Sequence, residues 1–137
     1  MRAPTTYVLD ASVGVKWFRH ERGSTAAIQL QQRSTLGEIR LAAPTHFVHE
    51  VLATVKREKR ADAVLDAWER IKASGMTIIP LTDEVIAEAV RQCEALGCSF
   101  YDSLAPACAS LLGATLASAD ARAHGAYPEV LLIGDEG

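Results

Sequence analysis

The stretch Thr6-Tyr7-Val8-Leu9-Asp10 begins as a run of strand-forming residues and ends on an acid. Short apolar runs bounded by polar residues are typical of strands that are buried in a parallel sheet. The following residues lead into an apolar helix that extends to Phe18, with Ser12 as the expected N-cap. The order strand, acid, helix predicts an α/β domain whose first strand delivers Asp10 to one edge of the sheet.

The alternation of strands and helices continues along the rest of the chain. Further strands are expected over 39–43, 76–81, 114–118 and 130–133, and helices over 26–32, 46–60, 63–73, 85–96, 99–112 and 121–124. Such alternation predicts a mostly parallel sheet that is covered by helices on both faces. We find no linker, repeat or low-complexity tract, so residues 1–137 are expected to form a single domain.

The composition favours a soluble protein of the reducing cytoplasm. Hydrophobic residues make up 49% of the chain and charged residues 23%, and no apolar run approaches the roughly 20 residues of a membrane helix. The N-terminus lacks the pattern of a secretory signal, and the three cysteines lack metal-finger spacing. The formal net charge of −3 argues against a broadly basic nucleic-acid binder, although an acidic metal site is compatible with a nuclease.

Four carboxylates fall where predicted strands end or helices begin: Asp10, Glu50, Asp102 and Asp120. The carboxyl ends of parallel strands form the ligand crevice of an open α/β sheet, so acids far apart in sequence can meet there. Carboxylate oxygens are the ligands that Mg²⁺ and Mn²⁺ prefer. We therefore expect the four acids to converge in one pocket, and metal-dependent phosphate chemistry is the leading hypothesis.

Each acid also has a purely structural interpretation. Asp10 and Asp120 can cap the helices that follow them, and Asp102 stands at capping-box spacing from Ser99. If Ser12 caps the first helix, Asp10 is free to bind a metal. Asp83, at the start of another helix, is interpreted as a cap with a favourable dipole contact and no catalytic part.

Two neighbours of the acids carry further expectations. Glu50 shares its side of the helix with His46, which is interpreted as a surface histidine because no third metal ligand is evident. Pro106 blocks the helical hydrogen bond to the carbonyl of Asp102, so the helix is expected to bend or to begin late. The chain has no Walker A loop, GxGxxG, HExxH or GxSxG motif, which excludes the common nucleotide, zinc-protease and serine-hydrolase sites.

The order and spacing of several motifs together resemble the PIN-domain family, and within it the small VapC-type toxin ribonucleases. The resemblance covers nearly the whole chain. It rests on these segments: Tyr7-Val8-Leu9-Asp10-Ala11-Ser12-Val13, Lys16-Trp17-Phe18, Ala43-Pro44, His49-Glu50-Val51, Phe100-Tyr101-Asp102-Ser103-Leu104, Ala119-Asp120 and Val130-Leu131-Leu132-Ile133-Gly134.

The resemblance implies a three-layer α/β/α sandwich with a Mg²⁺- or Mn²⁺-dependent endoribonuclease site. Its metal ligands and catalytic residues would be Asp10, Glu50, Asp102 and Asp120, with a hydroxyl contribution from Ser12. It also implies an RNA substrate, a homodimer and inhibition by a cognate antitoxin. We expect an apolar patch on the first helices to mediate the dimer contact, and an Arg or Lys of the antitoxin to enter the acidic pocket. The chain departs from the family pattern at Pro106 and in having no acid between Asp120 and Glu129.

Two other functions remain open. A phosphoacceptor receiver domain is also a small fold with acids at strand ends, but it would have paired acids after the first strand, where this chain has Asp10-Ala11, and a lysine after the last. A PIN-like domain kept only as an interaction module is the other alternative, and four intact acids argue against it. Metal-dependent cleavage of RNA that is lost on changing Asp10 would separate these functions.

Overall fold

The computed structural model describes residues 3–134. The chain alternates between strands and helices, as the sequence predicts. The elements are β1 (Thr6–Leu9), α1 (Ala11–Gly14), the 3₁₀ helix η1 (Val15–Trp17), α2 (Ser24–Thr35), β2 (Arg40–Pro44), α3 (Thr45–Glu58), α4 (Asp62–Ala73), β3 (Thr77–Ile79), α5 (Asp83–Leu96), α6 (Phe100–Leu112), β4 (Thr115–Ser118), α7 (Ala121–His124) and β5 (Val130–Leu132).

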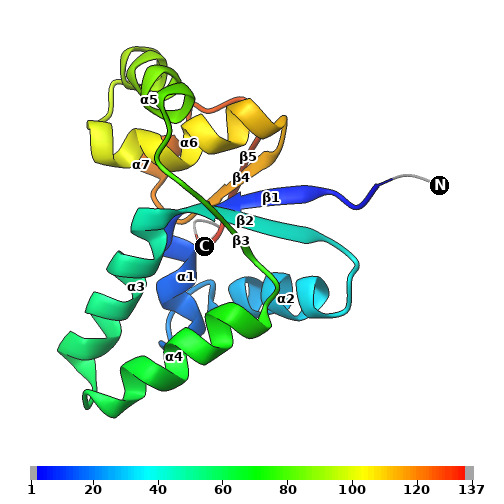
Figure 1. The fold of residues 1–137 in the computed structure, drawn as a ribbon, viewed down its shortest axis with the longest axis vertical. Coiled ribbons are helices and arrows are strands. Elements are labelled where there is room, and N and C mark those ends of the chain that lie inside the picture. The colour runs from blue at the N-terminus through cyan, green and yellow to red at the C-terminus, as the bar shows by residue number, and fades with distance from the viewer. Residues whose placement is uncertain (1–2, 135–137) are drawn as a thin grey trace.

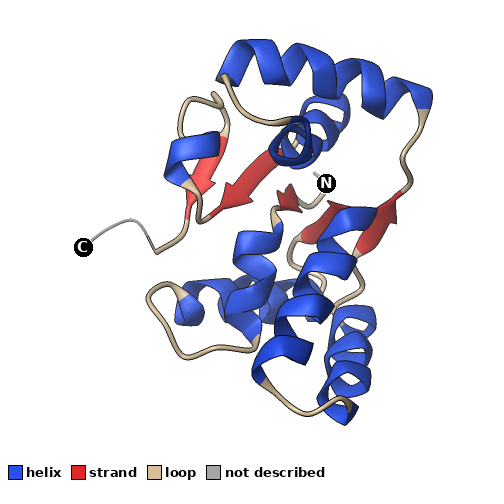
Figure 2. Ribbon diagram, turned by 90° about the vertical axis from the view of Figure 1, so that its left-hand side faces the viewer, coloured by secondary structure: helices blue, strands red, loops and turns tan. Residues whose placement is uncertain are grey.

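The five strands form one parallel sheet in the order β3-β2-β1-β4-β5. Helices α1 to α4 lie on one side of this sheet and α5 to α7 on the other (Figures 1 and 2). This arrangement confirms the predicted three-layer α/β/α sandwich. The order differs from the 2-1-3-4-5 order of receiver domains, which argues against the receiver alternative.

Successive residues of the central strand β1 belong to two separate hydrophobic cores, because successive side chains of a strand point to opposite faces of the sheet. Leu9 packs with Phe47, Val51 and other residues of the α1 to α4 layer. Val8 packs with residues of the α5 and α6 layer, among them Leu104. The sheet therefore carries one core on each face, and its carboxyl edge is where the two helical layers meet.

A close approach of α1 to α3 brings Asp10, which precedes α1, and Glu50, which lies on α3, into the same region. Gly14 ends α1, and a Cβ built there would lie 2.5 Å from the ring of Phe47 and 2.7 Å from Val51 on α3. Only glycine leaves room for this contact, because real Cβ atoms do not approach other atoms so closely. Gly14 thus sets the distance between the helix that follows Asp10 and the helix that carries Glu50.

Two sequence predictions about helix starts are corrected. Asp83 is not the cap of α5: the Oγ1 of Thr82 accepts the hydrogen bond from the backbone N–H of Val85, and Asp83 lies in the first turn. The late start expected for the helix of Asp102 is also wrong. Helix α6 begins at Phe100, capped by Ser99, and continues through Pro106 to Leu112.

Thr82→Ala should therefore destabilise the fold more than Asp83→Asn. Loss of the Thr82 cap should lower the free energy of unfolding by about 1 kcal/mol. Asp83→Asn removes only the interaction of a negative charge with the helix N-terminus, worth about 0.3–1 kcal/mol. Urea unfolding of the two variants measures the difference, and an equal or larger loss for Asp83→Asn would contradict the assignment of the cap.

The surface of the described residues also bears on the predicted partners. None of the helices in residues 3–134 is long and apolar enough to cross a membrane. The expected apolar patch on the first helices is not found: the exposed large apolar residues lie mainly on α5 and α6, as Ile86, Val90, Phe100, Tyr101, Leu111 and Leu112.

Candidate functional site

The five predicted site residues line a single cleft of about 410 Å³. Asp10 directly follows β1, and Asp120 follows β4, the strand that pairs with β1 on the side away from β2. The chain proceeds from β1 to β2 and β3 in one direction and places β4 on the other side, so this is the point at which the strand order reverses. Open α/β sheets bind their ligands in the crevice at such a point.

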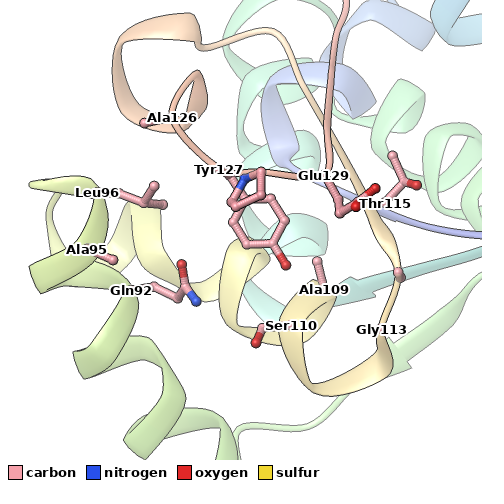
Figure 3. A pocket seen from close by; sticks show the side chains of 12 residues that line it. Gln92, Ala95, Leu96, Ala109, Ser110, Gly113, Thr115, Ala126, Tyr127 and Glu129 are labelled. Atoms are coloured by element: carbon pink, nitrogen blue, oxygen red, sulfur yellow. The ribbon is translucent and has the colours of Figure 1, made fainter.

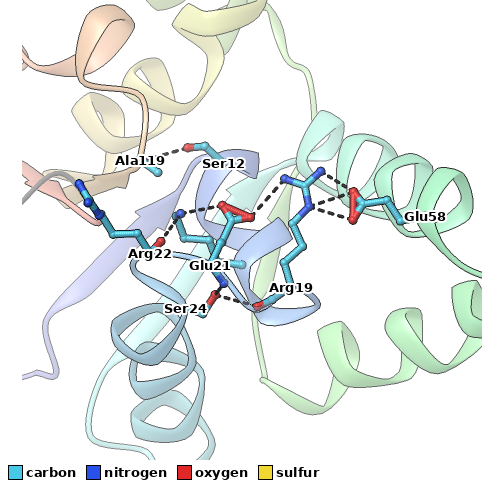
Figure 4. A network of polar contacts seen from close by, with 8 residues as sticks. Ser12, Arg19, Glu21, Arg22, Ser24, Glu58 and Ala119 are labelled. Atoms are coloured by element: carbon cyan, nitrogen blue, oxygen red, sulfur yellow. Dashed lines mark hydrogen bonds and ion pairs between the residues drawn. The ribbon is translucent and has the colours of Figure 1, made fainter.

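Asp10, and not Ser12, caps the first helix. The Oδ2 atom of Asp10 accepts a hydrogen bond of 3.0 Å from the backbone N–H of Ser12. The interpretation that Asp10 is left free because Ser12 caps is therefore wrong, although capping occupies only one of the two carboxylate oxygens. The hydroxyl oxygen of Ser12 instead accepts a hydrogen bond of 2.9 Å from the N–H of Ala119, which joins α1 to the end of β4 (Figure 4).

Asp120 is positioned by two hydrogen bonds of its own segment. Its Oδ1 atom caps α7 by accepting from the N–H of Ala123 at 3.0 Å, and its N–H donates to the hydroxyl of Ser118 at 3.0 Å. Capping and lining of the cleft are compatible here, because one carboxylate oxygen serves each purpose.

Fully buried His124 connects Asp120 to Asp102. Its Nε2 lies 2.7 Å from the carbonyl oxygen of Asp102, and its Nδ1 lies 2.6 Å from the hydroxyl of Ser118. A carbonyl oxygen only accepts hydrogen bonds, so Nε2 is the donor. One imidazole ring therefore holds the start of α6 against the end of β4.

Pro106 explains why the carbonyl of Asp102 is available to His124. Proline has no N–H, so the carbonyl four residues before it has no helical donor. Asp102 is that residue, and the carbonyl would be an unsatisfied group without His124. Pro106, where the chain departs from the family pattern, thus leaves a free carbonyl through which His124 links the segments of Asp102 and Asp120.

Glu50 projects from α3 into the cleft, one turn after His46. The interpretation of His46 as a surface histidine is wrong: the side chain is buried, and its ring packs edge-on against Tyr101 with the ring centroids 4.7 Å apart. The Nδ1 atom of His46 has no hydrogen-bond partner among the described residues.

Three charged side chains, Lys16, Arg19 and Glu21, form one wall of the cleft, and Glu58 binds to them from outside it. Buried Lys16 donates to the carboxylate of Glu21 at 3.0 Å and to the carbonyl of Arg22. The guanidinium of Arg19 contacts Glu21 and also binds both carboxylate oxygens of Glu58 on α3 (Figure 4). Hydrogen bonds and charge from Lys16 and Arg19 outweigh the effect of partial burial and hold the pKa of Glu21 below its usual range.

The sequence matches the model of the PIN domain family over residues 7–127. The chain belongs to this family. No curated protein sequence matches the PIN domain described here.

Solved structures with the same fold include several toxin–antitoxin proteins. This PIN domain matches a toxin–antitoxin complex from Klebsiella pneumoniae with a TM-score of 0.70 and 16% identity, covering 91% of this chain and 95% of that one. It matches VapBC2 from Rickettsia felis, bound to a promoter DNA fragment, with a TM-score of 0.69 and 16% identity over 93% and 97% of the two chains. It matches VapC20 from Mycobacterium tuberculosis, a toxin that cleaves the sarcin-ricin loop, with a TM-score of 0.68 and 13% identity over 90% and 98%.

The carboxylates of the PIN domain repel one another. Partial burial, together with the negative charges of Asp10 and Asp102, raises the pKa of Glu50, and Arg57 only partly offsets this effect. A raised pKa means that the ionised form of Glu50 is disfavoured in the folded chain. A bound cation would relieve this repulsion.

Glu50→Gln should therefore raise the melting temperature of the metal-free protein slightly at pH 7. Folded Glu50 holds its proton more tightly than unfolded Glu50, so stability falls as the pH rises from about 4.5 through the raised pKa. The glutamine variant lacks this loss, and its advantage should disappear at low pH. Thermal melts in EDTA across this range measure the effect, with Glu94→Gln on α5 as the control; a variant that is less stable than the parent at pH 7 would contradict the repulsion.

The donor set of the PIN domain fits a hard divalent cation in its chemistry, because four carboxylates line the cleft. Within residues 3–134, however, no three or more His, Cys, Asp or Glu side chains stand close enough together to hold a metal ion as they are placed. Binding would therefore require rotation of carboxylate side chains toward a common point.

A second hollow of about 740 Å³ lies at the opposite edge of the sheet, between α5, α6 and the amino ends of β4 and β5 (Figure 3). Tyr127 stands in it, and burial, with the charges of Glu88 and Glu129, raises the pKa of this tyrosine. None of the predicted site residues lines this hollow.

Sequence reasoning missed Lys16, Arg19 and His124 as parts of the cleft and its support. Lys16 belongs to the Lys16-Trp17-Phe18 segment and Arg19 comes directly after it, but nothing in the sequence marks either side chain as part of a site. A signal for His124 did exist, because Pro106 leaves a buried carbonyl without a donor and some side chain must satisfy it.

Proposed function

We propose that this protein is a metal-dependent endoribonuclease of the cytoplasm and the toxin of a toxin–antitoxin pair. The observation that carries the proposal is the convergence of Asp10, Glu50, Asp102 and Asp120 on one cleft at the reversal point of the sheet. Membership of the PIN domain family supports a nuclease. Toxin–antitoxin proteins among the structures of the same fold support the biological role.

The four carboxylates would hold Mg²⁺ or Mn²⁺ close to the scissile phosphate. When bound, such an ion lowers the pKa of a coordinated water and neutralises charge that develops on the phosphate. The protein contributes orientation: caps fix Asp10 and Asp120 at the ends of β1 and β4, and His124 fixes the segment of Asp102. No protein nucleophile is needed.

Ser12 contributes through both sides of its hydroxyl group. Its oxygen accepts the N–H of Ala119, so its own proton is free to be donated toward the cleft that it lines. A hydroxyl donor beside the acids suits a phosphate oxygen. In this role Ser12 orients the RNA and also keeps α1 in register with β4.

The acidic cleft also determines how a protein inhibitor would block the enzyme. A cognate antitoxin would place an Arg or Lys among Asp10, Glu50 and Asp102 and exclude the metal. Arginine suits this role better, because its planar guanidinium can contact two carboxylate oxygens at once. We further propose a homodimer, whose contact the exposed apolar residues Ile86, Val90, Leu111 and Leu112 of α5 and α6 would serve better than the first helices.

Cleavage of single-stranded RNA by the purified protein tests the proposed activity. Labelled RNA should be cut in Mg²⁺ or Mn²⁺ and remain intact in EDTA, and activity should return when the metal is restored. RNA that stays intact with every divalent ion would contradict the nuclease assignment. Recovery of a partner protein by co-purification from the native host tests the toxin role separately.

A further inference from the structure

Tyr101 stands at the junction of three adjoining hollows. It lines the acidic cleft, a hollow of about 350 Å³ that contains His49, Glu50 and Arg57, and an apolar hollow of about 250 Å³. We refer to the last as the apolar hollow; among its lining residues are Pro44, His46, Ile79, Leu81, Phe100 and Leu104. The cleft and the apolar hollow therefore adjoin at the contact between His46 and Tyr101, which line both.

The ring of Tyr101 has the properties of a stacking platform. It is 48% exposed, and the edge-on contact with buried His46 holds it in place. Exposed aromatic rings that are fixed from below are the groups on which single-stranded nucleic acids stack their bases.

The size of the apolar hollow selects a small occupant. Its volume of about 250 Å³ lies below the 300–1,000 Å³ of pockets for drug-sized ligands, so it suits a single ring system. His46, whose buried Nδ1 has no partner among the described residues, lines both this hollow and the cleft.

The charge on the adjoining surface is suited to phosphate. Arg57 forms no ion pair with a carboxylate among residues 3–134, and only its hydrogen bond of 3.0 Å to the hydroxyl of Thr54 is formed. Its remaining N–H donors are free, and it lines the same hollow as Glu50 and Tyr101. An RNA strand provides a phosphate for Arg57 and a base for Tyr101 at adjacent positions.

We propose that Tyr101 and the apolar hollow form a base-binding subsite that takes one unstacked nucleobase next to the scissile phosphate, with Arg57 holding a neighbouring phosphate. This inference rests on the proposed ribonuclease function and names how that site selects single-stranded RNA. A flipped base in the hollow requires an unpaired nucleotide, so a continuous duplex is excluded. An apolar side chain of a peptide would also fit the hollow, but it would leave Arg57 without an anionic partner.

Steady-state cleavage of two short single-stranded RNA substrates in Mg²⁺ tests the subsite. One substrate is intact, and the other lacks the base adjacent to the cleavage site. Tyr101→Ala should lower kcat/KM on the intact RNA about fivefold to 150-fold, mainly through KM, because one base loses its stacking partner. Tyr101→Phe should restore cleavage, and the abasic RNA should be cut equally by Tyr101→Ala and the parent. Leu65→Ala, which removes an exposed apolar side chain from α4, outside the cleft and both adjoining hollows, is the control.

The outcomes separate the subsite from the activity itself. If the parent cuts the intact RNA and Tyr101→Ala cuts it equally well, the subsite is overturned while the ribonuclease function stands. If Tyr101→Ala instead lowers cleavage of the intact and the abasic RNA by the same factor, the ring does not act on a base and the base-binding assignment is overturned. If the parent cuts no RNA, both the function and the subsite fail.

Discussion

Asp10→Asn should lower the rate of RNA cleavage by at least about a hundredfold while leaving the fold intact. The expected size follows from metal sites in general, where mutation of a residue that only hydrogen-bonds to a metal ligand already lowers metal affinity or activity about 10–100-fold. Asn caps helices as well as Asp does, so the hydrogen bond to the N–H of Ser12 can be kept. The substitution therefore removes the negative charge from the cleft and little else.

Single-turnover cleavage rates and urea unfolding of the same preparations check this expectation. Asp83→Asn is the matched control, since it removes a carboxylate from the first turn of α5, outside the cleft. Asp83→Asn should cleave RNA at the parent rate. Equal activity of Asp10→Asn and the parent would mean that the acids of the cleft do not carry the reaction.

His124→Phe should destabilise the protein by about 3 kcal/mol and lower RNA cleavage about 10–100-fold. Phenylalanine fills the fully buried site but leaves the carbonyl of Asp102 without a donor, at about 1–3 kcal/mol. It also removes one of the two hydrogen bonds of the Ser118 hydroxyl, which keeps the bond from the N–H of Asp120. The loss of activity follows because the segment of Asp102 is no longer held against the end of β4, as for other partners of metal ligands.

Two polar variants separate the contact of His124 with Asp102 from its contact with Ser118. His124→Gln extends far enough to donate to the carbonyl of Asp102, and His124→Asn is short enough to serve only Ser118. Gln should therefore restore more activity than Asn, measured as kcat at a temperature where all variants are folded. A greater rescue by Asn, or full activity of His124→Phe, would show that His124 does not position Asp102.

The sequence was sufficient to predict the layers of the fold and that the four acids and Ser12 line one cleft. Strands that end on Asp10 and Asp120 can be recognised locally, because an apolar run followed by an acid and a helix is a pattern of a few residues. The parallel sheet then requires their carboxyl ends to lie at one edge. Prediction succeeded wherever a local pattern and a topological rule were enough.

Which atoms satisfy which partners could not be predicted in the same way. Ser12 and Asp10 are equally good caps in isolation. The Ser12 hydroxyl instead accepts a hydrogen bond from the N–H of Ala119, directly after β4, and Asp10 is the cap. His46 looked like a surface residue because its burial depends on Tyr101, far away in the sequence. These contacts depend on tertiary packing, about which spacing along one helix carries no information.

The central position of β1 has a consequence for the newly synthesised chain. β1 is synthesised long before one of its two neighbours, β4, which consists of residues 115–118. Pairings between such distant segments form late in folding, because the entropy of closing a long loop is lost before the contacts stabilise the chain. A nascent chain that already contains Asp10, Glu50 and Asp102 therefore still lacks the wall that carries Asp120. The cleft can form only after synthesis has passed Asp120, so synthesis itself delays the appearance of the complete site.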